Sequence, residues 1–410
     1  MPVPLLRPFA GLRPAPQYAA EVAAPPYDVL SSDEARVLAE GKPWSFLHIS
    51  KPEIDLPAGT DLHAPAVYAK ARENLDRMVA AGVLRRDPAP CFYVYRLRMG
   101  EHVQTGLVGG GSVAAYDANR IRKHEFTRPD KEDDRVRQID ACDAQTGPVL
   151  LAHRSQPEIA AAIAATTAEP PAYSVTAADG IVHTLWVMAD PARVAAVVAA
   201  FDAMPALYIA DGHHRSAAAS RVAAARRAAG ATGDAHDSFL VVTFPIEEMK
   251  IFDYNRVVRD LNGLSRDAFL AAVAAEFAVA PVTGRARPAA PREFGLYLPG
   301  QWYRLTVKTA VPADPVARLD VSLLSDRLLT PVLGIADLRK DKRIDFVGGK
   351  RGLAELEKRV DSGEMAAAFA LFATSMEDLV AVAEAGQVMP PKSTWFEPKL
   401  ADGMVSYPLG

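Results

Sequence analysis

The chain has 410 residues, of which 50% are hydrophobic and 23% charged, and its formal net charge is −4. This composition is typical of a globular protein, and the weak negative charge excludes the general positive field of a nucleic-acid-binding protein. No apolar run reaches the roughly 18 residues of a membrane span. Prolines and arginines interrupt the N-terminus where a signal peptide needs an apolar core. The two cysteines, Cys91 and Cys142, predict reduced thiols. We therefore expect a cytoplasmic protein that binds neither nucleic acid nor membrane.

The N-terminal segment, as far as Leu56, is rich in proline and loops but contains one clear helix signal. Ser31 or Ser32 can cap a helix whose first turn carries two acidic residues. Residues 64–82 are predicted to form a second helix, and residues 91–117 alternate like a β-hairpin.

Alanine-rich helices around a strand are expected in residues 157–204, and residues 207–230 indicate a strand, a turn and a helix. Residues 237–265 predict a pair of strands with a turn between them. The stretch 281–295, rich in Pro, Ala and Arg, is the clearest linker-like segment, and residues 296–307 predict a short hairpin. Strands and helices alternate too irregularly for a Rossmann fold or a barrel, so we expect a mixed α/β protein.

The strand-to-helix turn in residues 207–230 concentrates the residues of an anion site in "ADGHHR". Gly212 lets the backbone turn sharply, and a helix starting near His214 leaves its first N–H groups unpaired. Arg215 adds a fork suited to phosphate or carboxylate, and His213 and His214 can donate when protonated. This combination favours an oxyanion.

Two other interpretations of the turn stay open at this point. A metal is less favoured, because His213 and His214 are adjacent and adjacent side chains diverge on a helix or a strand. A purely structural turn would use Asp211 as an N-cap and leave the histidines exposed.

The segment "RKHEFTRPDKEDDR", residues 122–135, interleaves five cations with five anions. A solvated charged helix has the same composition, but Pro129 interrupts the helix and places Arg128 in an extended or turn conformation. Positive charge on both sides of Glu125 favours its ionised form beside an anionic ligand. Polyphosphate chemistry needs this mixture, since cations neutralise phosphates while carboxylates hold Mg²⁺ or take a proton from the attacking hydroxyl.

Three shorter segments offer further polar side chains and are more often structural than catalytic. They present Tyr27 and Asp28 in "PPYDVLS", Asn255 and Arg256 in "FDYNRVV", and Lys392, Ser393, Thr394 and Trp395 in "MPPKSTWFEPK". The chain has no P-loop, no G-x-S-x-G elbow, no kinase signature and no H-E-x-x-H. A phosphate site here would therefore be an uncommon one.

Five blocks together resemble a bacterial family known as domain of unknown function 1015. They are "PPYDVLSSDEA", "RKHEFTRPDKEDDR", "ADGHHRSAAA", "NRVVRDLNGLS" and "VMPPKSTWFEPKL", in order from about residue 7 to about residue 404. The "DGHHR" block is similar to the phosphate-binding block of free-serine kinases in the ParB/sulfiredoxin-like superfamily. The resemblance implies a ParB/sulfiredoxin-like mixed-sheet core in residues 1–265, and an α/β region in residues 266–410 that completes the site.

The resemblance implies a pyrophosphate-dependent serine kinase, which converts L-serine and pyrophosphate to O-phosphoserine and phosphate with Mg²⁺. A nucleotide is the alternative donor. The phosphate-binding residues would be Asp211, Gly212, His213, His214, Arg215, Lys123, Arg128 and Arg135. Glu125 is the first choice for the base, Asp28 the second, and His214 a further catalytic candidate. Asp211 and Asp133 would lie near the metal, while serine would contact Tyr27, Asn255, Arg256, Lys392 and Ser393.

Two other functions could use the same turn. A ParB-like regulator would bind nucleotide to switch a partner-binding state, although ParB proteins carry Gly-Glu-Arg-Arg where this chain has His-His. A phosphatase would run serine phosphate chemistry with water as acceptor. The sequence leaves the direction of the reaction and the oligomeric state open.

Overall fold

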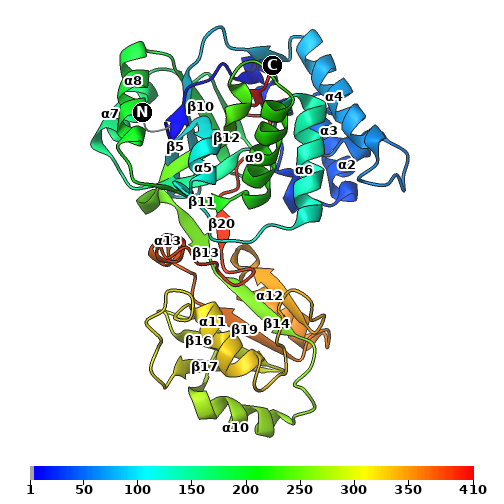
Figure 1. Cartoon of the computed structure of the whole chain (residues 1–410). Coiled ribbons are helices and arrows are strands. Elements are labelled where there is room, and N and C mark those ends of the chain that lie inside the picture. The colour runs from blue at the N-terminus through cyan, green and yellow to red at the C-terminus, as the bar shows by residue number, and fades with distance from the viewer. Residues whose placement is uncertain (1–3) are drawn as a thin grey trace. The chain divides into compact units, whose positions relative to one another are not determined.

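The computed structural model describes residues 4–410, and the chain divides into two compact units (Figure 1). The first unit comprises Met1–Met249 and Pro398–Gly410, and the second comprises Lys250–Glu397. This division differs from the expected boundary at residue 265, and it places the C-terminal tail in the first unit. The cause is a long-range pairing: β13 (Lys250–Phe252) and β20 (Trp395–Glu397) are antiparallel neighbours, so the second unit both begins and ends on strands of its own.

A nine-stranded mixed sheet forms the centre of the first unit, which confirms the expected α/β class with a mixed-sheet core. Its spatial order is β6 (Ile121–Arg122), β11 (Leu207–Asp211), β8 (Val149–His153), β12 (Ser238–Pro245), β5 (His102–Ser112), β4 (Phe92–Met99), β10 (Val182–Met188) and β9 (Tyr173–Thr176), with β1 (Leu6–Arg7) also beside β5. The pairs β11–β6 and β12–β8 are parallel and the others antiparallel. The predicted hairpin in residues 91–117 is confirmed as β4 and β5.

Helices and short strands complete the first unit. The helices are α1 (Ala19–Val22), α2 (Ser32–Ala39), α3 (Leu47–Ser50), α4 (Pro65–Ala80), α5 (Val113–Asp117), α6 (Pro129–Cys142), α7 (Pro157–Thr167), α8 (Pro191–Asp202) and α9 (His213–Ala228), and the short strands are β2 (Leu12–Pro14), β3 (Leu84–Arg86), β7 (Ala144–Gln145) and β21 (Tyr407–Pro408). No helix within residues 4–410 is both long and apolar enough to cross a membrane.

Close packing against the sheet explains a glycine of β5. An added Cβ at Gly106 would lie 2.2 Å from the carbonyl oxygen of Thr243 on β12. The position therefore admits only glycine without a shift of the neighbouring strand.

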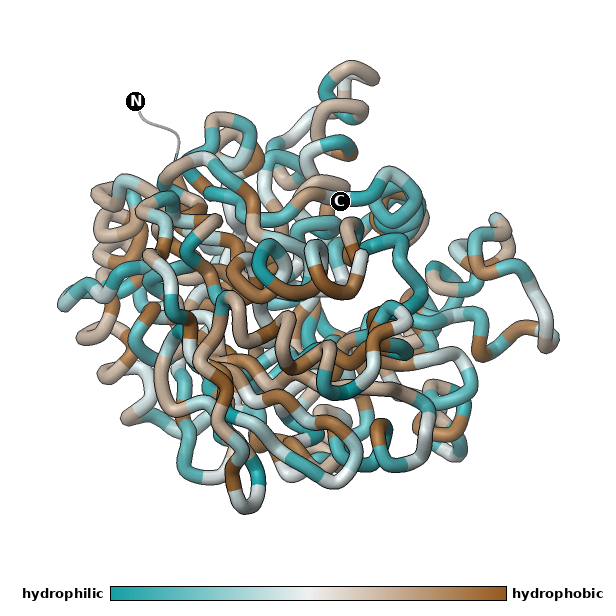
Figure 2. The backbone as a smooth tube through the Cα atoms, turned by 90° about the horizontal axis from the view of Figure 1, so that it is seen from below, coloured by the Kyte–Doolittle hydropathy of each residue, from teal (hydrophilic) through white to brown (hydrophobic). Residues whose placement is uncertain are grey.

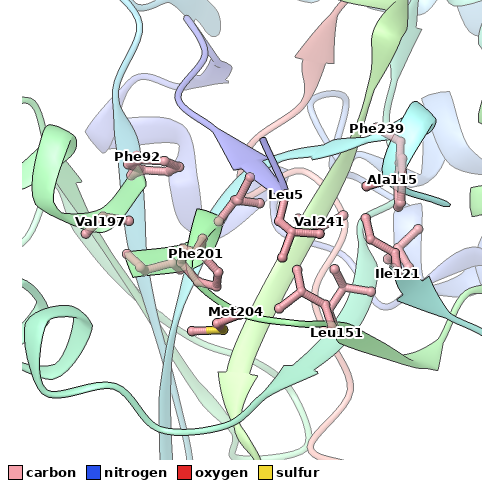
Figure 3. Close-up of a cluster of buried hydrophobic side chains, with 14 of the residues drawn as sticks. Leu5, Phe92, Ala115, Ile121, Leu151, Val197, Phe201, Met204, Phe239 and Val241 are labelled. Carbon is pink, nitrogen blue, oxygen red and sulfur yellow. The ribbon is translucent and has the colours of Figure 1, made fainter. Parts of the chain in front are cut away.

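The main hydrophobic core of the first unit lies between its sheet and its helices (Figure 3). Phe92 and Phe239 come from strands, whereas Phe201 comes from α8, and all three are fully buried. The hydropathy of the tube in Figure 2 changes from hydrophobic to hydrophilic many times along the chain, as expected where buried strands alternate with exposed turns.

We expect Phe239→Ala to lower the free energy of unfolding by about 3–5 kcal/mol, because the substitution leaves a cavity in this core. Phe239 is 0% exposed, and its ring meets Tyr116 edge-on with centroids 6.0 Å apart. Urea denaturation measures the change. Val37→Ala is the matched control, since Val37 is 73% exposed and its loss should change stability by less than about 0.5 kcal/mol. Equal effects of the two substitutions would contradict this description of the core.

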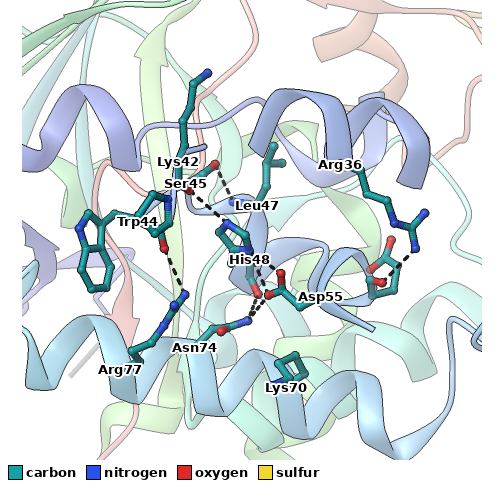
Figure 4. A network of polar contacts seen from close by, with 12 residues as sticks. Arg36, Lys42, Trp44, Ser45, Leu47, His48, Asp55, Lys70, Asn74 and Arg77 are labelled. Atoms are coloured by element: carbon teal, nitrogen blue, oxygen red, sulfur yellow. Dashed lines mark hydrogen bonds and ion pairs between the residues drawn. The ribbon is translucent and has the colours of Figure 1, made fainter. Parts of the chain in front are cut away.

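The N-terminal helices of the first unit are tied together by polar contacts, most of them partly buried (Figure 4). The amide of Asn74 on α4 donates to the carbonyl oxygen of His48, at 2.7 Å, and to Asp55, at 2.8 Å. The His48 ring contacts the same Asp55 carboxylate at 2.8 Å. The predicted cap is also confirmed, because Ser31 and Glu34 form a capping box at the start of α2.

An antiparallel six-stranded sheet forms the second unit, in the order β15 (Phe277–Val282), β17 (Gln301–Val307), β16 (Glu293–Leu298), β19 (Ala367–Leu371), β14 (Tyr254–Val258) and β18 (Ile344–Gly348). Its helices are α10 (Arg266–Glu276), α11 (Asp320–Leu324), α12 (Gly352–Asp361) and α13 (Met376–Glu384).

Two expectations about this part of the chain are wrong. Residues 237–265 do not form one strand pair, because β12 joins the first unit's sheet and β14 the second unit's. The stretch 281–295 is no domain linker, because it connects β15 to β16 inside the second unit. The predicted hairpin at 296–307 is confirmed as β16 and β17.

Candidate functional site

The turn between β11 and α9 has the geometry of a helix N-terminus built on glycine. Gly212 caps α9 with φ 98°, a left-handed conformation that side chains rarely adopt. A Cβ at Gly212 would also lie 3.2 Å from both the Arg215 guanidinium carbon and the Cα of Val149. Helix α9 begins at His213, one residue earlier than expected. Its first N–H groups and its positive dipole end therefore lie at the turn, as an anion site requires.

Arg215 lies in the first turn of α9 with its side chain only 11% exposed. Its guanidinium donates to the carbonyl oxygen of Pro148 and lies 3.5 Å from an Asp28 oxygen and 3.8 Å from an Asp211 oxygen. Burial lowers the pKa of Arg215, but the carboxylates of Asp28 and Asp211 outweigh burial and raise it above its ordinary value. Arg215 is thus a permanent buried cation, held by carboxylates at distances longer than those of a tight charge-assisted pair.

Lys399 brings a second cation to the turn from the C-terminal tail. Its ammonium group donates to an Asp211 oxygen at 3.3 Å. Although burial raises the pKa of Asp211, Lys399 and Arg215 hold it well below its usual range. Lys399 stands in the block "VMPPKSTWFEPKL", but no local pattern indicates its contact with Asp211, because 188 positions separate the two residues.

Asp402, three residues further along the tail, is a buried carboxyl with no hydrogen-bond partner on either oxygen among the described residues. It lines a cavity of about 20 Å³ together with Tyr27, Arg135 and Arg215. Burial raises the pKa of Asp402 to about 7, and Arg215 opposes this rise. No sequence motif indicated this residue.

The segment "PPYDVLS" reaches the turn through Tyr27 and Asp28, in a short helix at Tyr27–Val29. The Arg135 guanidinium carbon lies 3.9 Å from the Tyr27 ring centre, and Arg135 pairs with Asp134 at 2.6 Å. Arg135 was expected to bind phosphate, but these contacts already occupy its guanidinium. The phosphate-binding role of Arg135 stays a prediction, and in this structure its guanidinium contacts Tyr27 and Asp134.

The two histidines of the turn hold the segment before α6. His213 accepts the backbone N–H of His124 at its Nε2, at 3.4 Å, and His214 accepts the backbone N–H of Arg128 at its Nε2, at 3.0 Å. Burial lowers the pKa of both histidines below the ordinary value. Both rings are therefore neutral near pH 7 and carry their proton on Nδ1. In this arrangement they position residues 124–128 and do not act as cations.

We expect His214→Ala to increase amide hydrogen exchange at Arg128 by at least about tenfold, because the substitution removes the acceptor of that N–H. His213→Ala should act in the same way on the amide of His124. Exchange measured residue by residue at pH 7 tests both, and each variant is the control for the other. Unchanged protection at both amides would contradict the positioning role.

A cleft of about 380 Å³ lies on the other side of the α9 N-terminus. Its lining includes Tyr116, Lys123, Glu125, Thr127, His213 and Ser220. A Glu125 oxygen lies 3.7 Å from Nδ1 of His213, and the Lys123 ammonium lies 4.0 Å from the Tyr116 ring centre. Burial lowers the pKa of Lys123. The volume suits a small molecule, and the lining offers a cation and a carboxylate.

The residues expected to hold a metal do not form a metal site by themselves. Asp211 is occupied by Lys399 and Arg215, and Asp133 on α6 pairs with Arg221 at 2.7 Å. Within the described part of the chain no group of three or more His, Cys, Asp or Glu side chains could hold a metal ion. Arg128, expected at the phosphates, is exposed and pairs with Asp130 at 2.8 Å.

Four residues expected to bind substrate belong to the second unit, where they engage its own chain. Arg256 is 1% exposed and donates to the carbonyl oxygens of Tyr254 and Lys392. Asn255 is also buried; its amide donates to Asp253 and its oxygen accepts the N–H of Leu371. Ser393 donates to the carbonyl oxygen of Pro390, at 2.6 Å, and Lys392 has a φ of 61°. These contacts give Arg256 and Asn255 a structural role in the second unit.

Comparison with known proteins gives a family and distant structural similarities. No curated protein matches the chain. A conserved hypothetical protein from Pyrococcus furiosus is 14% identical with a TM-score of 0.33, over 69% of this chain and 90% of that one. A free serine kinase in complex with AMP is 14% identical with a TM-score of 0.33, over 68% and 84%. SbnI with a C-terminal truncation, from Staphylococcus aureus, is 13% identical with a TM-score of 0.35, over 74% and 87%.

Structural similarities at such low identity do not establish a function, so the function must be argued from the site itself. The family comparison is more extensive: residues 6–322 match the family described as protein of unknown function, DUF1015. This match confirms the resemblance of the five sequence blocks, and the chain belongs to the DUF1015 family.

Proposed function

We propose that the protein is a small-molecule phosphotransferase that phosphorylates free L-serine to O-phosphoserine, with pyrophosphate or a nucleotide as donor. The reaction class follows from the anion site at the start of α9 and the cleft beside it. Serine and pyrophosphate come from the family resemblance of the sequence blocks. The proposal assigns the donor phosphates to the turn and the serine to the cleft.

The observation that carries the proposal is the loose pairing of Arg215. Its carboxylate contacts, at 3.5 and 3.8 Å, are longer than the 2.6 Å pair of Arg135 with Asp134. A phosphate oxygen can replace such weakly held carboxylates, and it would gain a guanidinium fork and the N-terminal N–H groups of α9. Lys399, 3.3 Å from Asp211, supplies a second cation for the same phosphates.

In the proposed reaction Glu125 takes the proton of the serine hydroxyl, and the serine oxygen attacks the terminal phosphorus of the donor. The bond from that phosphorus to the bridging oxygen breaks, and the leaving group keeps the bridging oxygen: inorganic phosphate leaves from pyrophosphate, and the shortened nucleotide leaves from a nucleotide donor. The Nδ1 proton of neutral His213, which faces Glu125 at 3.7 Å, orients the carboxylate. Lys123 in the same cleft fits the serine carboxylate.

Magnesium has no protein-only site among the described residues, so the proposal assigns no step to it. Mg²⁺ commonly binds through substrate phosphates with few protein ligands. In this proposal it accompanies the donor as its counter-ion.

The test is an incubation of the protein with L-serine, Mg²⁺ and, in turn, pyrophosphate, ATP and ADP, with phosphoserine detected by mass spectrometry. We expect phosphoserine with pyrophosphate or with one of the nucleotides. No product with any donor would overturn the proposal. Phosphate release from O-phosphoserine alone would identify a phosphatase, and nucleotide binding without product would favour a ParB-like regulator.

A further inference from the structure

The C-terminal tail places an unpartnered carboxyl beside the proposed anion site. The backbone of Asp402 is fixed by two hydrogen bonds with Ala24, at 2.9 and 3.1 Å. The side chain is 1% exposed, and neither of its oxygens has a hydrogen-bond partner among the described residues. Buried carboxylates without hydrogen bonds are rare, because desolvation then acts on the charged form without compensation.

Charged groups of both signs surround Asp402, and three elements contribute them. Helix α9 contributes Arg215, α6 contributes Arg135, and the segment Tyr27–Val29 contributes Tyr27 and Asp28. Burial, which has the largest effect, and Asp28 disfavour an ionised Asp402, whereas Arg215, the backbone N–H of Tyr27 and Arg135 favour it. The balance raises the pKa of Asp402 to about 7, so small changes in nearby charge alter its protonation near neutral pH.

The cavity that Asp402 lines is small. Its volume of about 20 Å³ has room for roughly one water molecule. The hydroxyl of Ser50, which lines the same cavity and is 6% exposed, also has no hydrogen-bond partner in the described part of the chain. Among the charged groups around Asp402, Arg215 favours its ionised form most strongly.

We infer that Asp402 is a proton-exchanging group of the anion site, which takes up a proton from solvent when an anion binds to Arg215. A bound anion adds negative charge next to Asp402 and attracts the guanidinium that had stabilised its ionised form. The inference rests on the anion site of the proposed function, but it does not depend on catalysis. It assigns Asp402 a positioning role, since the residue acts through Arg215.

One quantitative consequence follows for binding. Above pH 7, where free Asp402 is ionised, binding must include the uptake of a proton, so affinity falls as the pH rises. We expect the affinity for sulfate to fall as the pH rises between about pH 7.5 and 8.5, by at most about tenfold per pH unit, the limit for one linked proton. Sulfate suits this test because its own charge is constant over the range, unlike that of pyrophosphate.

The experiment is isothermal titration of the full-length protein with sulfate at pH 8, in two buffers of different ionisation enthalpy. The difference in heat gives the number of protons bound per sulfate. We expect a measurable uptake of at most one proton per sulfate for the wild type, and much less for Asp402→Asn, whose amide cannot be protonated. Asp320→Asn is the control and should retain the uptake, because Asp320 is another carboxyl whose pKa is raised by burial but belongs to the second unit. His213→Asn and His214→Asn test the neighbouring rings, and loss of the uptake in either of them but not in Asp402→Asn would overturn the inference.

Asp402→Ser provides a second variant should the amide of the asparagine disturb the buried site, and thermal unfolding verifies that each variant is folded. Proton uptake equal to wild type in Asp402→Asn or Asp402→Ser would overturn the inference. Sulfate binding to wild type without uptake would overturn it too and leave the phosphotransferase proposal intact, whereas failure to bind sulfate would overturn the inference. Proton-linked binding without phosphoserine formation would support the inference and reject the phosphotransferase.

Discussion

Arg215→Ala should lower the rate of phosphoserine formation by at least about 10³-fold, because arginines that neutralise a transferred phosphoryl group contribute effects of this size. The substitution removes a buried cation that lies near both Asp28 and Asp211. Affinity for pyrophosphate should fall as well, since the guanidinium contacts the donor before and during transfer. Initial rates measured by mass spectrometry and pyrophosphate binding measured by titration calorimetry give the two readouts.

Two companion variants separate this effect from damage to the fold. Arg227→Ala removes an arginine from the far end of the same helix, where Arg227 pairs with Asp237 at 2.5 Å, and should change the rate by less than about twofold. Arg215→Lys keeps the charge beside the two carboxylates but loses the planar fork, so a rate between those of wild type and Arg215→Ala is expected. Near-normal turnover in a folded Arg215→Ala variant would show that the turn does not bind the donor phosphates and has only a structural role.

Glu125→Gln should lower kcat by about 10²- to 10⁴-fold, the usual contribution of a general base. The amide keeps the shape of the side chain and its place in the cleft, 3.7 Å from His213, but it accepts no proton. Pyrophosphate affinity should stay within about twofold of wild type, because Glu125 lies in the cleft and not at the Arg215 turn. Rate measurements at saturating serine separate the loss in kcat from any change in KM.

Comparison of Asp28→Asn with Glu125→Gln identifies which of the two carboxylates is the general base. Asp28 is the other carboxylate that could take the serine proton, and it contacts Arg215 at 3.5 Å. If Asp28→Asn loses kcat while Glu125→Gln does not, the base is Asp28. If both variants keep the wild-type kcat, neither carboxylate acts as the general base.

The local structure of this chain could be predicted well from its sequence. Ser31 with Glu34 is a contiguous capping signal, and it marks the start of α2. Gly212 after an apolar run predicted the strand, turn and helix that the structure contains, to within one residue. Both signals involve residues that lie close together in the sequence, so they can be recognised in a single sequence.

The arrangement of distant segments could not be predicted in this way. Lys399 reaches Asp211 across 188 positions, and nothing near either residue indicates the other. The assignment of β12 and β14 to different sheets depends on strand partners that lie far away in sequence. The role of the histidines depends on which backbone N–H groups approach their rings. In each case the deciding interaction is a tertiary contact. Local residue propensities and the spacing of motifs contain no information about such contacts.

The division of the first unit by the second has a consequence for biosynthesis. Helix α9 and its turn leave the ribosome well before Pro398–Gly410, because the whole of Lys250–Glu397 is translated in between. Until then, a nascent chain has Arg215 without Lys399 or Asp402, and β7 without its partner β21. Domains generally fold from the N-terminus during synthesis, but here the first unit must wait for a segment translated after the second. A ribosome that stalls within Lys250–Glu397 therefore carries a nascent chain whose anion site is still unfinished.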